Sequence, residues 1–479
     1  MLKKVQKLLF KKKFGFDEWD GRTQKKVFAF AEEYKDFLTK NKTERKVVSW
    51  VKKRAERDGF IHLETINSSK SLKRVSKIYN INREKSIVLA RFGKQSAQKG
   101  VRIILAHIDS PRLDLKPAPL YEKERLVFLK THYYGGIKKY QWPSIPLALS
   151  GTIIKGNGEK VEIELGNKPT DPILMITDLL PHLSKKQLEK KLEEAVEAED
   201  LNLIVGSKAL AISEQERQKI ASEGSISLAK LGVLALLEKE YQISEEDFVS
   251  ADIEIVPAAE ARDLGFDRSL VAGYGQDDRI CAYTALAAFL EVKDPIVPTV
   301  LVLVDKEETG SEGATGATSN FIVDFIGEML FLETGRSEEN LLRDALSLSK
   351  AVSADVTVGF DPDYEEVFDP LNTARVGAGI AVEKYTGRGG KYATSEATAE
   401  YTGWFRRVLN QEKVLWQTGG LGKVDLGGGG TVAMFLARHN LDIIDAGPPL
   451  LSMHAPYEIS SKADLWSCYQ AYRAFYQAR

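Results

Sequence analysis

The sequence predicts an α/β fold, in which a mixed sheet flanked by helices is interrupted by an inserted β-rich domain. Residues 101–107 (VRIILAH) and 300–304 (VLVLV) are apolar along almost their whole length, as expected for strands that are buried on both faces of a sheet. Residues 118–170 contain short alternating runs separated by glycines, which is typical of β-rich structure. A chain of 479 residues, 43% of them hydrophobic, is long enough for a large core and a second unit.

The other elements of the α/β part follow in chain order. Residues 1–60 carry apolar side chains at helical spacing, and residues 86–93 predict a further strand. Residues 276–292 predict a helix that begins beside two aspartates, and residues 321–332 and 441–445 continue the α/β pattern. In such sheets the ligand sites usually lie at strand ends, so we expect the functional residues at the ends of the apolar runs.

The inserted part continues beyond its β-rich half. Residues 183–245 are dominated by Lys, Glu, Leu and Ala, which predicts helices on a solvated surface. We therefore expect one α/β domain made of residues 1–117 and 252–479. The inserted β-rich and helical domain is expected at residues 118–251.

The composition argues against several classes of protein. The formal net charge is −1, which provides no basic field for nucleic acid or for an anionic membrane. No run of about 18 apolar residues predicts a membrane span, and the apolar run at residues 8–10 is too short for a signal peptide. The only cysteines, Cys281 and Cys468, form no CxxC pair, so we expect the reducing cytoplasm as the location.

Residues with catalytic chemistry follow two of the predicted strands. His107 ends the first apolar strand, and Asp109 lies two residues further on the same side of an extended chain, where it can hold the ring nitrogen that a metal does not use. Glu307 and Glu308 follow the second apolar strand, where two buried charges are costly unless one binds a metal and the other handles protons. Each pattern alone also fits a strand cap or a surface turn.

Three further candidates lie later in the chain. Asp277 precedes a predicted helix, where paired acids usually act as caps, although one carboxylate can also bridge two metal ions. Asp355 and His454 each follow a short apolar segment and would be ordinary loop residues by themselves. Nitrogen and carboxylate ligands without thiolate suit zinc, cobalt or manganese, and two ions that share a carboxylate need about five protein ligands. The candidate ligands are His107, Asp277, Glu308, Asp355 and His454.

The order of these motifs resembles a known family. HxDSPRxxxKP, a GxDDR-type turn, DxEExGSExxxGA, SAD and LSMHxxxE follow one another from about residue 100 to the C-terminus. In this order they resemble the aspartyl aminopeptidase and vacuolar aminopeptidase I family of zinc metallopeptidases. The resemblance implies a co-catalytic zinc aminopeptidase fold with two divalent ions per chain, peptide substrates with free N-termini, and homo-oligomers as large as tetrahedral dodecamers. It also implies that the inserted domain serves as lid and oligomerisation unit.

The resemblance further implies a role for each residue. Glu307 would be the general base, and Asp109 would hold His107 in place. The metal ligands would be His107 and Asp355 for one ion, Glu308 and His454 for the other, and Asp277 as the bridge between them.

One segment departs from the family pattern. Where aspartyl aminopeptidases carry a WHxWFDRDL-like string, residues 134–147 read YGGIKKYQWPSIPL, without the histidine and the Asp-Arg pair. This departure is typical of a bacterial branch and leaves the preference for acidic N-terminal residues open. A pocket for an acidic residue needs a cation, and Arg388 or Lys391 could supply it, although a surface role fits them equally well.

Two other functions fit the same residues. A related deacylase or dipeptidase would use the same metal ligands. A non-catalytic assembly protein could keep the fold, but the intact ligand set together with Glu307 favours an enzyme. A nucleic-acid binder would need a basic excess and an aromatic stacking surface, which the sequence lacks.

Overall fold

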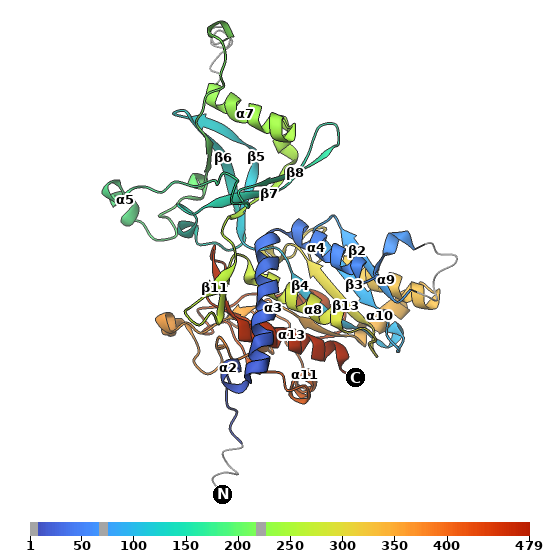
Figure 1. The fold of residues 1–479 in the computed structure, drawn as a ribbon. Helices are drawn as coiled ribbons and strands as arrows, with labels where there is room; N and C mark the ends of the chain where they lie inside the picture. Colours follow the sequence, from blue (N-terminus) through green and yellow to red (C-terminus); the bar gives the residue numbers. More distant parts are fainter. Residues whose placement is uncertain (1–7, 67–74, 217–226) are drawn as a thin grey trace. The chain divides into compact units, whose positions relative to one another are not determined.

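The computed structural model describes residues 8–66, 75–216 and 227–479, and these form two compact units. The first unit comprises Met1–Ser110, Ala261–Met453 and Glu458–Arg479, and the second comprises Pro111–Glu260 with the short segment His454–Tyr457. Figure 1 draws the second unit mostly in cyan and green, the colours of the middle of the sequence. The chain therefore leaves the first unit after Ser110 and returns at Ala261.

The first unit is built on a mixed sheet, which has nine strands among the described residues. β13 runs parallel to β4 and antiparallel to β3, while β4, β14 and β18 run parallel to one another. Every residue of β4 and β13 is buried, as their apolar sequences predict. In sheet order the strands are β1 (Ile61–His62), β2 (Lys77–Asn82), β3 (Ser86–Arg91), β13 (Thr299–Val304), β4 (Arg102–His107), β14 (Lys350–Ser353), β18 (Asp442–Gly447), β16 (Ile380–Glu383) and β17 (Trp416–Thr418).

Helices cover both faces of this sheet, as Figure 1 shows. One core lies under α3 (Gly21–Lys40), α4 (Glu44–Arg57), α8 (Gln276–Glu291), α11 (Ala399–Gln411) and α13 (Lys462–Gln477). The core of the opposite face lies under α9 (Phe321–Thr334), α10 (Glu339–Ser347) and α12 (Ala433–Ala437). α8 packs against the sheet and against α13 and is buried along most of its length, which fixes its first turn in place.

Smaller elements complete the first unit. A three-stranded sheet joins β11 (Arg262–Leu264), β12 (Leu270–Gly273) and β20 (Glu458–Ser461), and β12 leads directly into α8. β15 (Thr357–Val358) pairs with β19 (Pro449–Leu450), and the short helix α2 (Gly15–Glu18) precedes α3. The α/β fold class expected from the sequence is confirmed by this arrangement and by the solved structures compared below.

The second unit is an antiparallel sheet with its own apolar core. The core includes the fully buried Trp142 and side chains from most of the strands. Two helices are described in this unit, α5 (Lys185–Leu188) and α7 (Leu228–Tyr241). In sheet order its strands are β8 (Lys160–Leu165), β7 (Leu147–Ile154), β10 (Asp252–Pro257), β5 (Arg112–Lys123), β6 (Leu126–Tyr134) and β9 (Leu203–Gly206).

The helices predicted for residues 183–245 are only partly present. Within the described residues, the stretch before α7 forms the four-residue helix α5, a 3-10 helix (Ala198–Asp200), irregular chain, the strand β9 and three helical residues at 214–216. The helical prediction was therefore wrong for most of residues 189–213. Leu188 and Leu192 of this stretch are exposed, so no apolar face is buried to stabilise a longer helix. None of the helices in the described parts of the chain has the length and apolar character that a bilayer span requires.

Candidate metal centre

The carboxyl ends of two neighbouring parallel strands bring the first candidate residues together. His107 is the last residue of β4 and pairs with Val304, the last residue of β13. The chain after β13 turns at once into the short 3-10 helix Glu307–Thr309, so Glu307 and Glu308 lie near His107. Asp277 enters from the first turn of α8. Strand ends and a helix start thus converge on one edge of the sheet.

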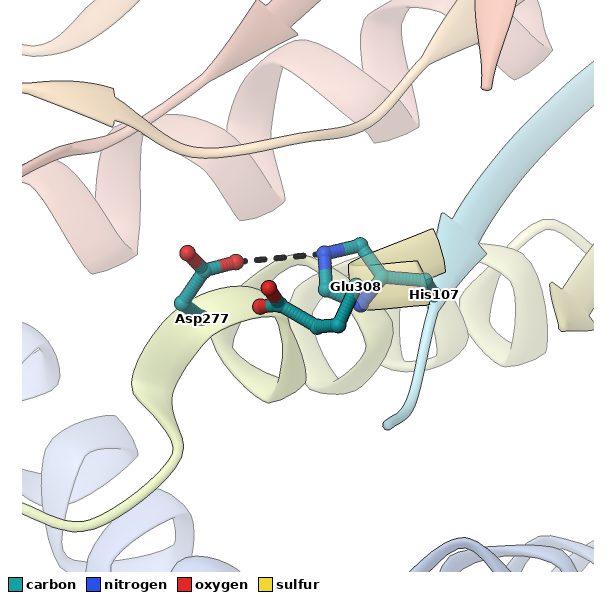
Figure 2. Close-up of side chains that lie close together, drawn as sticks. All are labelled: His107, Asp277 and Glu308. Atoms are coloured by element: carbon teal, nitrogen blue, oxygen red, sulfur yellow. Dashed lines mark hydrogen bonds and ion pairs between the residues drawn. The ribbon is translucent and has the colours of Figure 1, made fainter. Parts of the chain in front are cut away.

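His107 is the centre of the cluster and is almost completely buried. Its Nε2 atom lies 3.1 Å from Oδ1 of Asp277, 3.8 Å from Oδ1 of Asp355 and 3.9 Å from Oε2 of Glu307. Figure 2 shows Asp277 and Glu308 turned toward the His107 ring. Four of the sequence-predicted residues therefore lie around one imidazole.

Two overlapping sets of donor atoms are close enough to hold a cation, and they share His107, whose Nε2 can bind only one ion. Ligand atoms of His107, Asp277 and Glu308 lie within 4.8 Å of one another, and so do those of His107, Asp278 and Asp355. The structure thus brings together four of the five predicted ligands. It adds Asp278, which the sequence reasoning treated only as a neighbour of Asp277.

The electrostatics of the cluster fit a bound cation. Burial is the largest cause that raises the pKa of Asp355 well above its usual range, and the negative charges of Glu307 and Asp277 add to it. Burial likewise raises the pKa of Asp278, whose carboxyl oxygens make no hydrogen bond of normal geometry among the described residues. Packed carboxyl groups of this kind, with oxygen and imidazole donors and no thiolate, suit zinc and related divalent ions.

Asp109 supports the cluster from behind. Burial disfavours the charged form of His107, but hydrogen bonds to Asp109 and Asp277 outweigh it and raise the pKa of His107 well above its usual range. Nδ1 of His107 lies 3.0 Å from the carbonyl oxygen of Asp109 and 3.3 Å from its carboxylate. The same carboxylate accepts hydrogen bonds from the backbone amides of Glu307 and Glu308, each at 3.1 Å. One side chain therefore holds two of the segments that carry candidate residues, and the sequence predicted only the first of these contacts.

A second network holds Asp277. The Glu458 carboxylate accepts hydrogen bonds from the amides of Gln276 (2.6 Å) and Asp277 (3.1 Å). Ser110 donates to the Asp277 carbonyl at 2.5 Å, and the buried Arg279 donates to the Ser110 hydroxyl at 2.8 Å. Sequence reasoning missed these supports, although Glu458 closes the LSMHxxxE string and Arg279 closes the GxDDR-type turn.

Glycine is required at the entry to α8. Gly275 has φ +68°, in the left-handed region, and a Cβ atom there would lie 1.8 Å from the Arg279 guanidinium. The glycine therefore admits the arginine that supports the Asp277 segment.

The remaining predicted residues are not among these groups. His454 belongs to the segment that groups with residues 111–260, and its Nδ1 lies 2.9 Å from the carbonyl oxygen of Gly136. The exposed Lys391 forms an ion pair with Glu396 at 2.9 Å, and no ion pair is described for Arg388. The roles of these three residues stay predictions from the sequence.

Comparison with known proteins identifies the family. The profile of the aminopeptidase I zinc metalloprotease family (M18) matches residues 37–476. A probable M18 family aminopeptidase 1 of Clostridium acetobutylicum is 47% identical over 469 residues, which is 98% of both chains, and that of Thermotoga maritima is 44% identical over 95% of this chain and 97% of its own.

Solved structures agree with the sequence comparison. The Thermotoga maritima M18 aminopeptidase superimposes with a TM-score of 0.91 at 43% identity, covering 98% of this chain and 100% of the other. Aminopeptidase I of Clostridium acetobutylicum superimposes with a TM-score of 0.90 at the same identity and coverage. The resemblance inferred from the motifs is thereby confirmed. This chain belongs to the M18 family of zinc metalloproteases, and it is an aminopeptidase, a metal-dependent hydrolase.

Proposed function

We propose that the chain releases N-terminal residues from peptides by a centre that holds two divalent ions. His107 and Asp355 would hold one ion, Glu308 and His454 the other, and Asp277 both. The observation that carries the proposal is the pair of donor groups that meet at His107. The assignment of His454 comes from the sequence resemblance.

Glu307 is the proposed general base. It stands next to the ligand Glu308, and its side chain is only 19% exposed, so its carboxylate is partly shielded from solvent. When bound, the ions would polarise the peptide carbonyl and lower the pKa of the attacking water toward neutrality. Glu307 would accept the proton of that water and return it to the leaving amine, while Asp109 keeps the Glu307 amide in place.

Hydrolysis of a panel of aminoacyl-nitroanilides and short peptides tests the activity. We expect release of N-terminal residues with zinc, cobalt or manganese, and loss of it after chelation. Cleavage of N-acylated substrates alone would instead establish the related deacylase. Metal-loaded protein that cleaves neither class would contradict the proposal.

The number of ions and the choice of bridge need a separate measurement. Asp278 offers an alternative carboxylate on the Asp355 side. We expect Asp277→Asn to lose affinity for both ions, and Asp278→Asn to keep two. Counting the metal ions bound to each purified variant identifies the bridging residue. The opposite pattern would make Asp278 the bridge.

A preference for acidic N-terminal residues is the finer part of the proposal. Arg388 is the better candidate to contact a substrate carboxylate, because Lys391 already pairs with Glu396 and lies over the Tyr385 ring. The substrate panel repeated with Arg388→Ala and Lys391→Ala tests both residues. Unchanged substrate selectivity in both variants would show that neither Arg388 nor Lys391 contacts the substrate.

Assembly into a homo-oligomer through the second unit is also proposed. A solved yeast aminopeptidase 1 is described as a dodecamer and superimposes with a TM-score of 0.73 at 19% identity, covering 93% of this chain and 95% of its own. The second unit exposes Leu179, Leu180, Leu183, Leu188 and Leu192, an apolar set that suits burial between subunits. Light scattering of the cytoplasmic protein would give the assembly size, and a monomer alone would contradict this part.

A further inference from the structure

The backbone of Asp277 does not follow the regular geometry of α8. Asp277 has a ψ of 107° and Asp278 a ψ of 31°, so neither residue has a helical conformation, although α8 begins one residue earlier. The amide and the carbonyl of Asp277 therefore do not take their orientation from the hydrogen-bond ladder of the helix. The position of the Asp277 carboxylate in the metal cluster depends instead on contacts with other parts of the chain.

Ser110 holds the carbonyl group of Asp277. Its hydroxyl oxygen lies 2.5 Å from the Asp277 carbonyl oxygen and 2.8 Å from a guanidinium nitrogen of Arg279. A guanidinium can only donate, so the Ser110 oxygen accepts from Arg279 and its single hydrogen is directed to Asp277. Arg279 is itself buried, and its other nitrogens donate to the carbonyl oxygens of Gly275 at 3.0 Å and Asn41 at 2.9 Å. The direction of the Ser110 hydroxyl is therefore fixed by its surroundings.

Glu458 holds the amide group of Asp277. Its Oε2 atom accepts hydrogen bonds from the backbone amides of Gln276 at 2.6 Å and Asp277 at 3.1 Å. The Gln276 side chain donates in return to the Glu458 carbonyl oxygen at 2.7 Å. The side-chain oxygen of Gln276 accepts from the hydroxyls of Ser460 at 2.5 Å and Tyr34 at 3.2 Å. All of these residues are buried, so Glu458 is held from several sides.

Both holding residues stand where the chain passes from one unit to the other. Ser110 is the last residue of the first unit before Pro111, and Glu458 is the first residue after the segment His454–Tyr457. Ser110 lies 167 positions before Asp277 and Glu458 lies 181 positions after it, so only the fold brings them to the same residue. A displacement of the chain at either passage would act directly on the Asp277 backbone.

We infer that Ser110 and Glu458 are positioning residues, a clamp that holds both backbone polar groups of Asp277 and thereby fixes the carboxylate proposed to bridge two ions. Without the Ser110 hydroxyl, the Asp277 carbonyl loses this donor and Arg279 loses an acceptor. The Asp277 carboxylate is then less firmly held in its place 3.1 Å from Nε2 of His107, which Figure 2 shows. The inference rests on the proposed role of Asp277 as a metal ligand.

Three serine variants of the full chain test the clamp. Ser110→Ala removes the hydroxyl, Ser110→Thr keeps it, and Ser349→Ala is the matched control. Ser349 is as deeply buried as Ser110, and its hydroxyl likewise donates to a backbone carbonyl, that of Ala345 at 2.7 Å. It precedes β14, however, at the end of the strand away from Asp355. Each protein is titrated with zinc against a chelator and loaded with cobalt for its visible absorption spectrum, and Tm, kcat and KM are measured.

We expect Ser110→Ala to lose zinc affinity by roughly 10- to 100-fold and to shift the absorption of bound cobalt, because the bridging carboxylate is no longer held in one geometry. Ser110→Thr keeps the hydroxyl donor and should bring the zinc affinity back to within about threefold of the wild-type value. In the zinc-loaded protein, kcat should fall in Ser110→Ala with little change in KM. Ser349→Ala should lower Tm alone.

Glu458→Gln tests the other half of the clamp. The amide side chain keeps an oxygen that can accept from the two backbone amides, but it lacks the charge that strengthens these hydrogen bonds. We therefore expect a smaller loss of zinc affinity, roughly 3- to 10-fold, together with a shifted cobalt spectrum. This variant decides the inference if Ser110→Ala does not fold.

Two results would overturn the inference. One is a wild-type zinc affinity and cobalt spectrum in both Ser110→Ala and Glu458→Gln. The other is a Tm loss in Ser110→Ala like that of Ser349→Ala with an unchanged cobalt spectrum, since Ser110 would then stabilise the fold without positioning Asp277. If the wild-type protein cleaves no peptide substrate, the proposed function fails instead, and the zinc affinity and cobalt spectrum of Ser110→Ala still decide the inference.

Discussion

Replacing Asp109 with asparagine isolates its support of Glu307 and Glu308, the proposed general base and the proposed metal ligand. The backbone carbonyl of residue 109 stays 3.0 Å from Nδ1 of His107, so the orientation of the His107 ring survives the change. The carboxylate, however, loses its charge and one of its two acceptor oxygens. An asparagine can accept from the amide of Glu307 or of Glu308, but its own NH2 group then faces the other amide, donor against donor.

The size of the effect follows from these contacts. A hydrogen bond to a buried charged acceptor contributes about 1.5–3 kcal/mol, and the variant loses at least one of two. A loss of about 2 kcal/mol corresponds to about a 30-fold change in an equilibrium or rate constant. We therefore expect zinc affinity and kcat to fall, by about 30-fold in the more sensitive of the two, with little change in KM.

Two assays check this prediction. Competition with a chromogenic chelator gives the zinc affinity, and hydrolysis of the best nitroanilide substrate gives kcat and KM. Asp114→Asn is the matched control, because its side chain is 37% exposed and pairs with Arg112 in the second unit. The reasoning is refuted if Asp109→Asn retains both zinc affinity and kcat within about twofold of the wild-type values.

Three further changes have defined outcomes. Glu307→Gln should lower kcat by about 10²–10⁴-fold and leave the zinc content unchanged, as metal analysis of the same sample would verify. Gly447→Ala would place a Cβ atom 1.9 Å from the Asp355 carbonyl oxygen, so we expect a loss of about 1–3 kcal/mol in the free energy of unfolding, measured in urea. Burial raises the pKa of Asp464 to about 8, although hydrogen bonds from two backbone amides act in the opposite direction. The contribution of the protonated side chain to stability is therefore complete below about pH 4 and is lost as the pH rises through about 8. Asp464→Asn should flatten the decline in Tm between about pH 4 and about pH 8, and a parallel decline in both proteins would disprove the assignment.

The sheet was predictable because its central strands are continuously apolar. A run such as 300–304 has no polar face and must be covered on both sides, which is how the structure has it. The motif residues were also found from sequence, since His107, Glu307 and Glu308 stand directly at strand ends. The domain boundaries predicted at residues 117 and 252 stay expectations. The structure has a compact unit whose main segment is Pro111–Glu260.

What the sequence could not predict depends on contacts between distant parts of the chain. The carboxylate of Asp109 reaches amides almost 200 residues away, and nothing in its local sequence points to them. The helical prediction for the stretch before α7 was wrong for a different reason. The composition of this stretch favours helix, but no partner surface buries its leucines.

The position of the insertion also sets an order for synthesis. β4 pairs with β13 and β14, and both lie about 190 or more residues further along the chain. At roughly 5–20 residues per second, β4 leaves the ribosome about 10–40 seconds before its first neighbour exists. The six strands described in the second unit are made within that interval, and among the described residues their sheet contains no strand of the first unit. The sheet of the inserted unit can therefore form while the buried strand β4 still has no partner strand, and that interval is the period in which a chaperone would protect the chain most.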